Sequence, residues 1–153
     1  MPDELLRPTI GAGVDLSVRP WRLKSQTYVA FFGGAISATL IAFFNAHRLG
    51  VDAGARRLIL LTGAIGFVLS SAAQILLERL LGSSDPYAAV PTIASTVVAV
   101  VCSIVQQRFQ RPMDRAVQLR GIEYRSLWGP GIAAVLAGGI IDSLVYYVVD
   151  GAL

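Results

Sequence analysis

The chain has 153 residues, of which 54% are hydrophobic and 15% charged, with a formal net charge of +3 and a mean hydropathy of +0.61. Soluble domains carry about 25% charged residues, so this composition excludes an ordinary soluble protein as well as a disordered one. Cys102 is the single cysteine of the chain, which excludes a scaffold held by disulfide bonds.

Residues 1–27 are polar and contain prolines and charges of both signs. A signal peptide requires a short basic start, an apolar stretch and a cleavage site of small residues. We therefore expect a polar N-terminal tail in front of a membrane domain that covers residues 28–150.

Long apolar segments dominate this domain, at residues 28–46, 58–77, 88–107 and 130–149. The first three contain no charged residue, and the last contains one, Asp142. About 20 helical residues cross a hydrocarbon core that is about 30 Å thick. The sequence therefore predicts an all-α, polytopic membrane protein with four transmembrane helices in an antiparallel bundle, in contact with the lipid bilayer.

Small residues recur at every fourth position of the first apolar segment, at Ala30, Gly34, Ala38, Ala42 and Ala46. Positions four apart lie on one face of a helix. Lipid provides little hydrophobic drive between helices, so close backbone approach through small residues is a main source of their association. We expect this small-residue stripe to pack against another helix, in the same chain or in a second copy.

The stretch from Ser25 to Gly50 resembles a segment of small bacterial integral membrane proteins of unknown function. Those proteins share an SQ lead-in, an FGG helix start and an NxxRLG helix end, which correspond here to Ser25-Gln26, Phe32-Gly33-Gly34 and Asn45-Ala46-His47-Arg48-Leu49-Gly50. Ala35 stands where the resemblance leads us to expect proline. The likeness covers about 26 residues and implies a bacterial inner-membrane protein without catalytic residues.

Two other families of four-helix membrane proteins are similar in size. Small multidrug transporters carry a glutamate in their first helix, and no acidic residue occurs in the first apolar segment here. Fluoride channels carry a signature arginine near their first Gly-Gly motif, and that arginine is also absent.

Asp142 is the thirteenth of twenty residues in segment 130–149. A carboxylate at this depth costs at least about 2.5 kcal/mol unless it is neutral or paired. Three interpretations remain open: a proton or ion site, a structural partner of Gln74, Ser70 or Ser71, or a hydrated position near the membrane interface. Gln74 and Asp142 are the candidate intramembrane polar site.

Residues 108–127 form a predicted basic loop with five arginines. We expect Arg108, Arg111 and Arg115 to bind lipid headgroups, with Phe109, Met113, Ala116 and Val117 on one face of a short interfacial helix. No nucleic-acid motif accompanies these arginines, so we expect no nucleic-acid partner.

The distribution of Lys and Arg predicts the orientation. The loops at 47–57 and 108–127 together hold eight of them, against five on the other side of the membrane. The positive-inside rule then places these two loops in the cytoplasm and both termini outside the cell membrane.

The chain contains no catalytic, metal-binding or nucleotide-binding motif, and His47 is its single histidine. We therefore expect neither enzyme activity nor a metal or cofactor. The sequence favours an accessory or scaffold subunit, held in a membrane complex or a homo-oligomer by its small-residue helix faces. The alternative is a small channel or proton-coupled transporter that uses Asp142.

Overall fold

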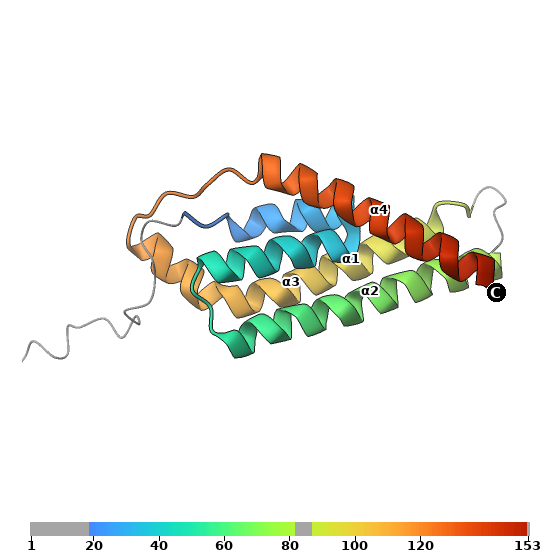
Figure 1. Ribbon diagram of the computed structural model, residues 1–153, viewed down its shortest axis with the longest axis horizontal. Coiled ribbons are helices and arrows are strands. Elements are labelled where there is room, and N and C mark those ends of the chain that lie inside the picture. Colours follow the sequence, from blue (N-terminus) through green and yellow to red (C-terminus); the bar gives the residue numbers. More distant parts are fainter. Residues whose placement is uncertain (1–18, 82–86, 153) are drawn as a thin grey trace, which may run out of the picture.

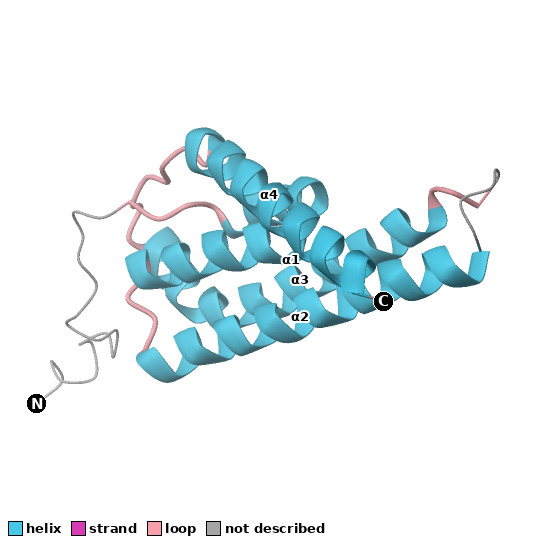
Figure 2. Cartoon of the chain, turned by 45° about the vertical axis from the view of Figure 1, so that its right-hand side comes forward, coloured by secondary structure: helices cyan, strands magenta, loops and turns pink. Residues whose placement is uncertain are grey.

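The structure, a computed structural model, describes residues 19–81 and 87–152, and side chains up to residue 149. Its helices are α1 (Leu23–Arg48), α2 (Ala53–Leu81), α3 (Val90–Leu119) and α4 (Trp128–Ala152) (Figures 1 and 2). All four are long and apolar enough to cross a membrane, and they pack against one another. The predicted all-α fold with four apolar helices is confirmed.

Helix α1 folds back on itself at Gly34. The backbone there is not helical, with φ 70° and ψ −167°. The backbone N–H of Trp21 donates a hydrogen bond of 2.7 Å to Oδ1 of Asn45, although 24 residues separate them. In a straight helix these residues would be roughly 36 Å apart. The two halves, 23–33 and 35–48, therefore run antiparallel and form a hairpin (Figure 1).

The conformation of Gly34 explains why the turn occurs there. Its φ and ψ lie in a region that is essentially restricted to glycine, because a Cβ would clash with the backbone. The two halves of the hairpin are roughly 16 and 21 Å long, so neither half alone is long enough to cross a hydrocarbon core about 30 Å thick. The sequence predicted a continuous first helix at 28–46, and the structure differs from it at this turn.

The start of α1 consequently lies at the same end of the molecule as the loops that follow α1 and α3. The guanidinium of Arg48 lies 4.2 Å from the ring centroid of Trp21. The backbone N–H of Arg125 donates a 2.9 Å hydrogen bond to the carbonyl oxygen of Pro20, and Arg19 forms a 3.1 Å ion pair with Glu123. We call this end of the molecule, where α1 begins and the loops after α1 and α3 lie, the basic end. The prediction that the N-terminal tail and these loops lie on opposite sides is wrong for the described part of the tail; residues 1–18 lie outside the described residues.

The small-residue stripe is divided by the turn, and its alanines are buried inside this single chain. Ala30, Ala38, Ala42 and Ala46 are at most 2% exposed, whereas Gly34 is half-buried at the turn. The hairpin contacts α2, α3 and α4, so it is the central element of the bundle. The partner of the stripe is therefore internal.

Helix α4 approaches the hairpin at Gly138. The hydroxyl of Ser37 lies 2.6 Å from the carbonyl oxygen of Gly33 and 2.7 Å from that of Ala134, so it joins the hairpin to α4. A Cβ on Gly138 would collide with this hydroxyl, whereas a Cβ on Gly139 would have no neighbour within 4 Å.

These neighbouring glycines provide a matched test of the packing. Gly138→Ala is expected to destabilise the protein by about 1–3 kcal/mol, because the helices must separate to admit the methyl group. Gly139→Ala is the control and is expected to have no destabilising effect. Thermal unfolding of both variants in one detergent checks this, and equal melting temperatures would contradict the close approach.

Helix α3 continues to Leu119, so the predicted basic loop 108–127 is wrong over its first twelve residues, 108–119. The predicted helix face exists, but Phe109, Met113 and Val117 pack on the core formed with the hairpin and α2 and do not face lipid.

The connection to α4 covers residues 120–127. Its Tyr124 hydroxyl donates a 2.8 Å hydrogen bond to Asp114 on α3, and burial, followed by this bond, raises the pKa of Tyr124.

Buried amide side chains hold the hairpin to α3. Nδ2 of Asn45 donates to Oε1 of Gln110 at 3.0 Å, and Gln26 and Gln110 exchange two hydrogen bonds of 3.3 Å. All three side chains are fully buried. We call Gln26, Asn45 and Gln110 the amide cluster. It closes the basic end of the bundle with polar contacts that water and lipid do not reach.

Candidate functional site

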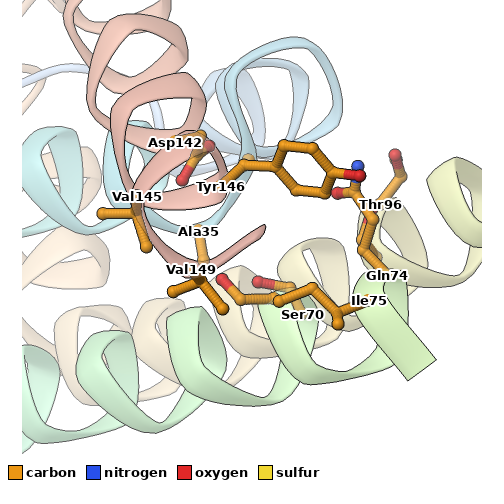
Figure 3. A pocket seen from close by; sticks show the side chains of 12 residues that line it. Ala35, Ser70, Gln74, Ile75, Thr96, Asp142, Val145, Tyr146 and Val149 are labelled. Carbon is orange, nitrogen blue, oxygen red and sulfur yellow. The ribbon is translucent and has the colours of Figure 1, made fainter. Parts of the chain in front are cut away.

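A cavity of about 110 Å³ lies on the other side of the hairpin tip from the amide cluster. Because α1 turns back, it does not fill the space between the far halves of α2, α3 and α4. The cavity occupies this space (Figure 3). Its wall combines apolar side chains with polar ones from three helices: Ser70, Ser71, Gln74, Ser95, Thr96, Asp142 and Tyr146. We call it the Asp142 cavity.

Asp142 lies where the cavity meets the hairpin tip. Its Oδ2 is 3.0 Å from the position that a Cβ on Gly34 would occupy, so a side chain at Gly34 would require the carboxylate to shift by a few tenths of an ångström. Asp142 is fourteen residues from the start of α4, or roughly 21 Å along the helix, and therefore lies inside the membrane-spanning segment. The side chain is half-buried and has no hydrogen bond or ion pair with any described residue.

The tip also brings the end of a helix to this cavity. The half 35–48 begins at Ala35, which lines the wall. The first backbone N–H groups of a helix lack partners within it, and the helix dipole makes this end partly positive. A carboxylate at this point is therefore favoured electrostatically without a basic side chain.

Gln74 lines the same cavity as Asp142, as the sequence suggested, but the two do not bond to each other. Nε2 of Gln74 donates a 3.2 Å hydrogen bond to Oε1 of Glu78, one turn further along α2. The hydroxyl of Ser70 donates to the carbonyl oxygen of Phe67 at 3.0 Å. The structural pairing considered for Asp142 is therefore not found.

Glu78 and Tyr146 form a contact that the sequence did not predict. The hydroxyl of Tyr146 donates a 2.6 Å hydrogen bond to Oε2 of Glu78, which connects α4 to α2. Figure 3 shows the Tyr146 side chain extending from α4 toward Gln74 and Thr96. The two residues are 68 positions apart in the sequence, and only the three-dimensional arrangement joins them.

The predicted headgroup residues lie on the outside of α3. Arg108, Arg111 and Arg115 are exposed, while Gln107, Gln110 and Asp114 on the opposite side of the helix are buried. Their position at the basic end allows contact with headgroups. Among residues 19–81 and 87–149, no three His, Cys, Asp or Glu side chains gather as metal ligands would.

No protein-family model, curated protein or solved structure matches the chain. The geometry of the cavity and the hairpin therefore carries the functional interpretation.

Proposed function

We propose that the protein is a small channel or proton-coupled transporter whose binding site is the Asp142 cavity. The observation that carries this proposal is an unpaired carboxylate beside a re-entrant hairpin tip at membrane depth. Non-helical backbone at that depth is tolerated where it is buried in protein or lines a water-filled cavity. Intramembrane carboxylates commonly mark the pathways of protons or ions, and broken helices commonly form the sites of transporters. The proposal involves no enzyme activity and no cofactor.

An accessory or scaffold subunit is the second candidate. The small-residue stripe no longer supports it, because those alanines pack within the chain. The exposed surface of α4 supports the scaffold proposal. Because α4 packs mainly against the hairpin, its other side exposes apolar residues that lipid or another subunit would cover, including Ile140, Leu144 and Val148.

For the orientation, we propose that the basic end faces the cytoplasm of a bacterial cell. Among the described residues, eleven lysines and arginines belong to this end and Arg79 alone to the other: Arg19, Arg22, Lys24, Arg48, Arg56, Arg57, Arg108, Arg111, Arg115, Arg120 and Arg125. This asymmetry is much larger than the one that a straight first helix gives, and it follows the positive-inside rule. The cavity then lies in the outer half of the membrane, and the start of α3 and the end of α4 lie on the outer side.

Reconstituted vesicles test the transport proposal. Asp142→Asn retains the shape of the side chain but cannot ionise, so proton or cation flux is expected to fall to the level of empty vesicles. Thermal stability is expected to stay within about 1 kcal/mol of the wild type, because Asp142 makes no hydrogen bond that the change would remove.

Asp52→Asn is the matched control for this experiment. Asp52 accepts a 2.9 Å hydrogen bond from the backbone N–H of Ala55 at the start of α2, far from the cavity, and asparagine caps a helix equally well. Its flux is expected to equal that of the wild type. Wild-type vesicles no more permeable than empty ones, or an unchanged flux in Asp142→Asn, would refute the proposal.

A further inference from the structure

We propose that the Asp142 cavity binds a small organic ammonium ion, a protonated amine with only a few heavy atoms. This inference rests on the proposed function, because it assigns a ligand class to the same site. Three properties of the cavity carry it: its hydrogen-bonding groups, its charge and its apolar walls.

The hydrogen-bond donors of the wall are largely occupied, and acceptors remain. Thr96 and Ser95 donate their hydroxyl protons to the carbonyl oxygen of Thr92, at 2.8 and 3.0 Å. Ser70 likewise donates to its own helix, and the Gln74 amide and the Tyr146 hydroxyl donate to Glu78. A hydroxyl that donates its proton still offers lone pairs. The wall is therefore best suited to a ligand that donates hydrogen bonds.

The charge of the wall selects a cation. No Lys, Arg or His of the described residues lines the cavity, while the Asp142 carboxylate does, and Glu78 contacts two of its wall residues. The carboxylate would repel an anion, and a neutral ligand would leave it with only the partial positive charge of the helix end at Ala35.

The remaining wall favours an organic cation over an alkali metal ion. A bare metal ion requires a full set of oxygen ligands to replace its hydration shell. Here the polar atoms are separated by the apolar side chains of Ile75, Val145 and Val149, and the Tyr146 ring also lines the space. Alkyl groups pack on such a surface, and an ammonium group interacts favourably with an aromatic face.

The volume limits the size of the ligand. An engineered protein cavity of about 150 Å³ binds benzene, which has six heavy atoms, so a cavity of about 110 Å³ has room for a ligand of roughly three to five heavy atoms. Ethylammonium fits this limit, and N-methylglucamine is too large for it.

Thermal unfolding of the purified full-length protein tests the ligand class. Melting temperatures are compared in ethylammonium, potassium and N-methylglucamine chlorides at equal ionic strength. A ligand that binds only the folded state raises the melting temperature, so we expect ethylammonium to raise it by roughly 3 °C over both other salts. Ethanol and sodium acetate, which resemble the ligand without its positive charge, are expected to have no such effect.

Variants assign the effect to the cavity. Asp142→Asn is expected to raise the apparent Kd for ethylammonium at least about tenfold, because the counter-charge is lost. Glu123→Gln also removes one carboxylate, but it lies in the exposed connection to α4 and is expected to leave the Kd unchanged. Asp142→Asn is first checked for folding, and its melting temperature in N-methylglucamine chloride must equal that of the wild type. Asp142→Glu retains the negative charge and is expected to bind ethylammonium more tightly than Asp142→Asn does.

The outcomes separate this inference from the transport proposal. Stabilisation by potassium alone, or an equal response of Asp142→Asn and wild type, would overturn the ammonium assignment. A flux that depends on Asp142, without any stabilisation by ethylammonium, would overturn it while leaving the transport proposal in place. Stabilisation that depends on Asp142 without any flux would support the ligand class and refute transport.

Discussion

Gly34→Ala is expected to lower the melting temperature of the protein by roughly 5–10 °C. The φ of +70° and ψ of −167° at Gly34 are accessible almost only to glycine, so any other residue strains the turn by about 1–3 kcal/mol. The added Cβ also stands 3.0 Å from Oδ2 of Asp142, so the carboxylate must shift slightly to admit it. Gly34→Leu is expected to be more damaging still.

Gly129→Ala is the control for this substitution. Gly129 lies in the first turn of α4, and a Cβ there would have no neighbour within 4 Å. Alanine is a better helix former than glycine, so this variant is expected to be as stable as the wild type or slightly more stable. If Gly34→Ala unfolds at the same temperature as Gly129→Ala, α1 does not turn at Gly34.

Gln110→Leu is expected to destabilise the protein by about 2–4 kcal/mol in thermal or denaturant unfolding. Leucine fills a similar volume but leaves the amide groups of Gln26 and Asn45 buried without their hydrogen-bond partner. The hairpin would lose its polar attachment to α3, which has no replacement from water in this buried position. Leu119→Gln exchanges the same two residue types at an exposed position of the same helix and is expected to cost less than about 0.5 kcal/mol.

A double-mutant cycle identifies the amide cluster as the cause. Once Gln110 is leucine, changing Gln26 to leucine as well removes an unpaired amide, so this second step is expected to cost less than Gln26→Leu in the wild type. Additive effects of the two changes would mean that the two side chains do not interact.

Hydropathy was sufficient to predict the fold class, because a helix in lipid requires a long uncharged segment. It was insufficient for the course of α1, because the 26 residues Leu23–Arg48 suit either a straight span or a hairpin. The Gly33-Gly34 pair is the local signal of the turn. Glycine is also common at helix contacts in membranes, so the sequence alone does not distinguish a turn from a packing position.

The extent of α3 was missed for a related reason. Its exposed arginines suggested a loop, and its buried residues between 106 and 114 are mostly polar, so neither side resembles a membrane helix. The spacing of Gln106, Gln110 and Asp114 is nevertheless helical, and this periodicity was the available signal. A hydropathy scale scores each residue by itself, so it does not identify a helix whose buried polar residues pair with one another.

The candidate site was partly predictable. A carboxylate at the position of Asp142 is costly in lipid, and this cost singled it out together with Gln74. The cavity itself was not predictable, since it exists because α1 turns back at Gly34 and does not fill the far half of the bundle. The hydrogen bond between Tyr146 and Glu78 depends on how α2 and α4 meet, which no local pattern encodes.

The side of the membrane on which α1 begins tests the re-entrant hairpin most directly. Single cysteines are introduced in a Cys102→Ala background at four exposed positions: Arg19 before α1, Ala53 after it, Arg120 after α3, and Ala88 before α3. Intact cells are then treated with a membrane-impermeant thiol reagent. The hairpin predicts that Ala88→Cys is labelled, while Arg19→Cys, Ala53→Cys and Arg120→Cys react only after the cells are opened. Labelling of Arg19→Cys together with Ala88→Cys would show that α1 crosses the membrane and would contradict the hairpin.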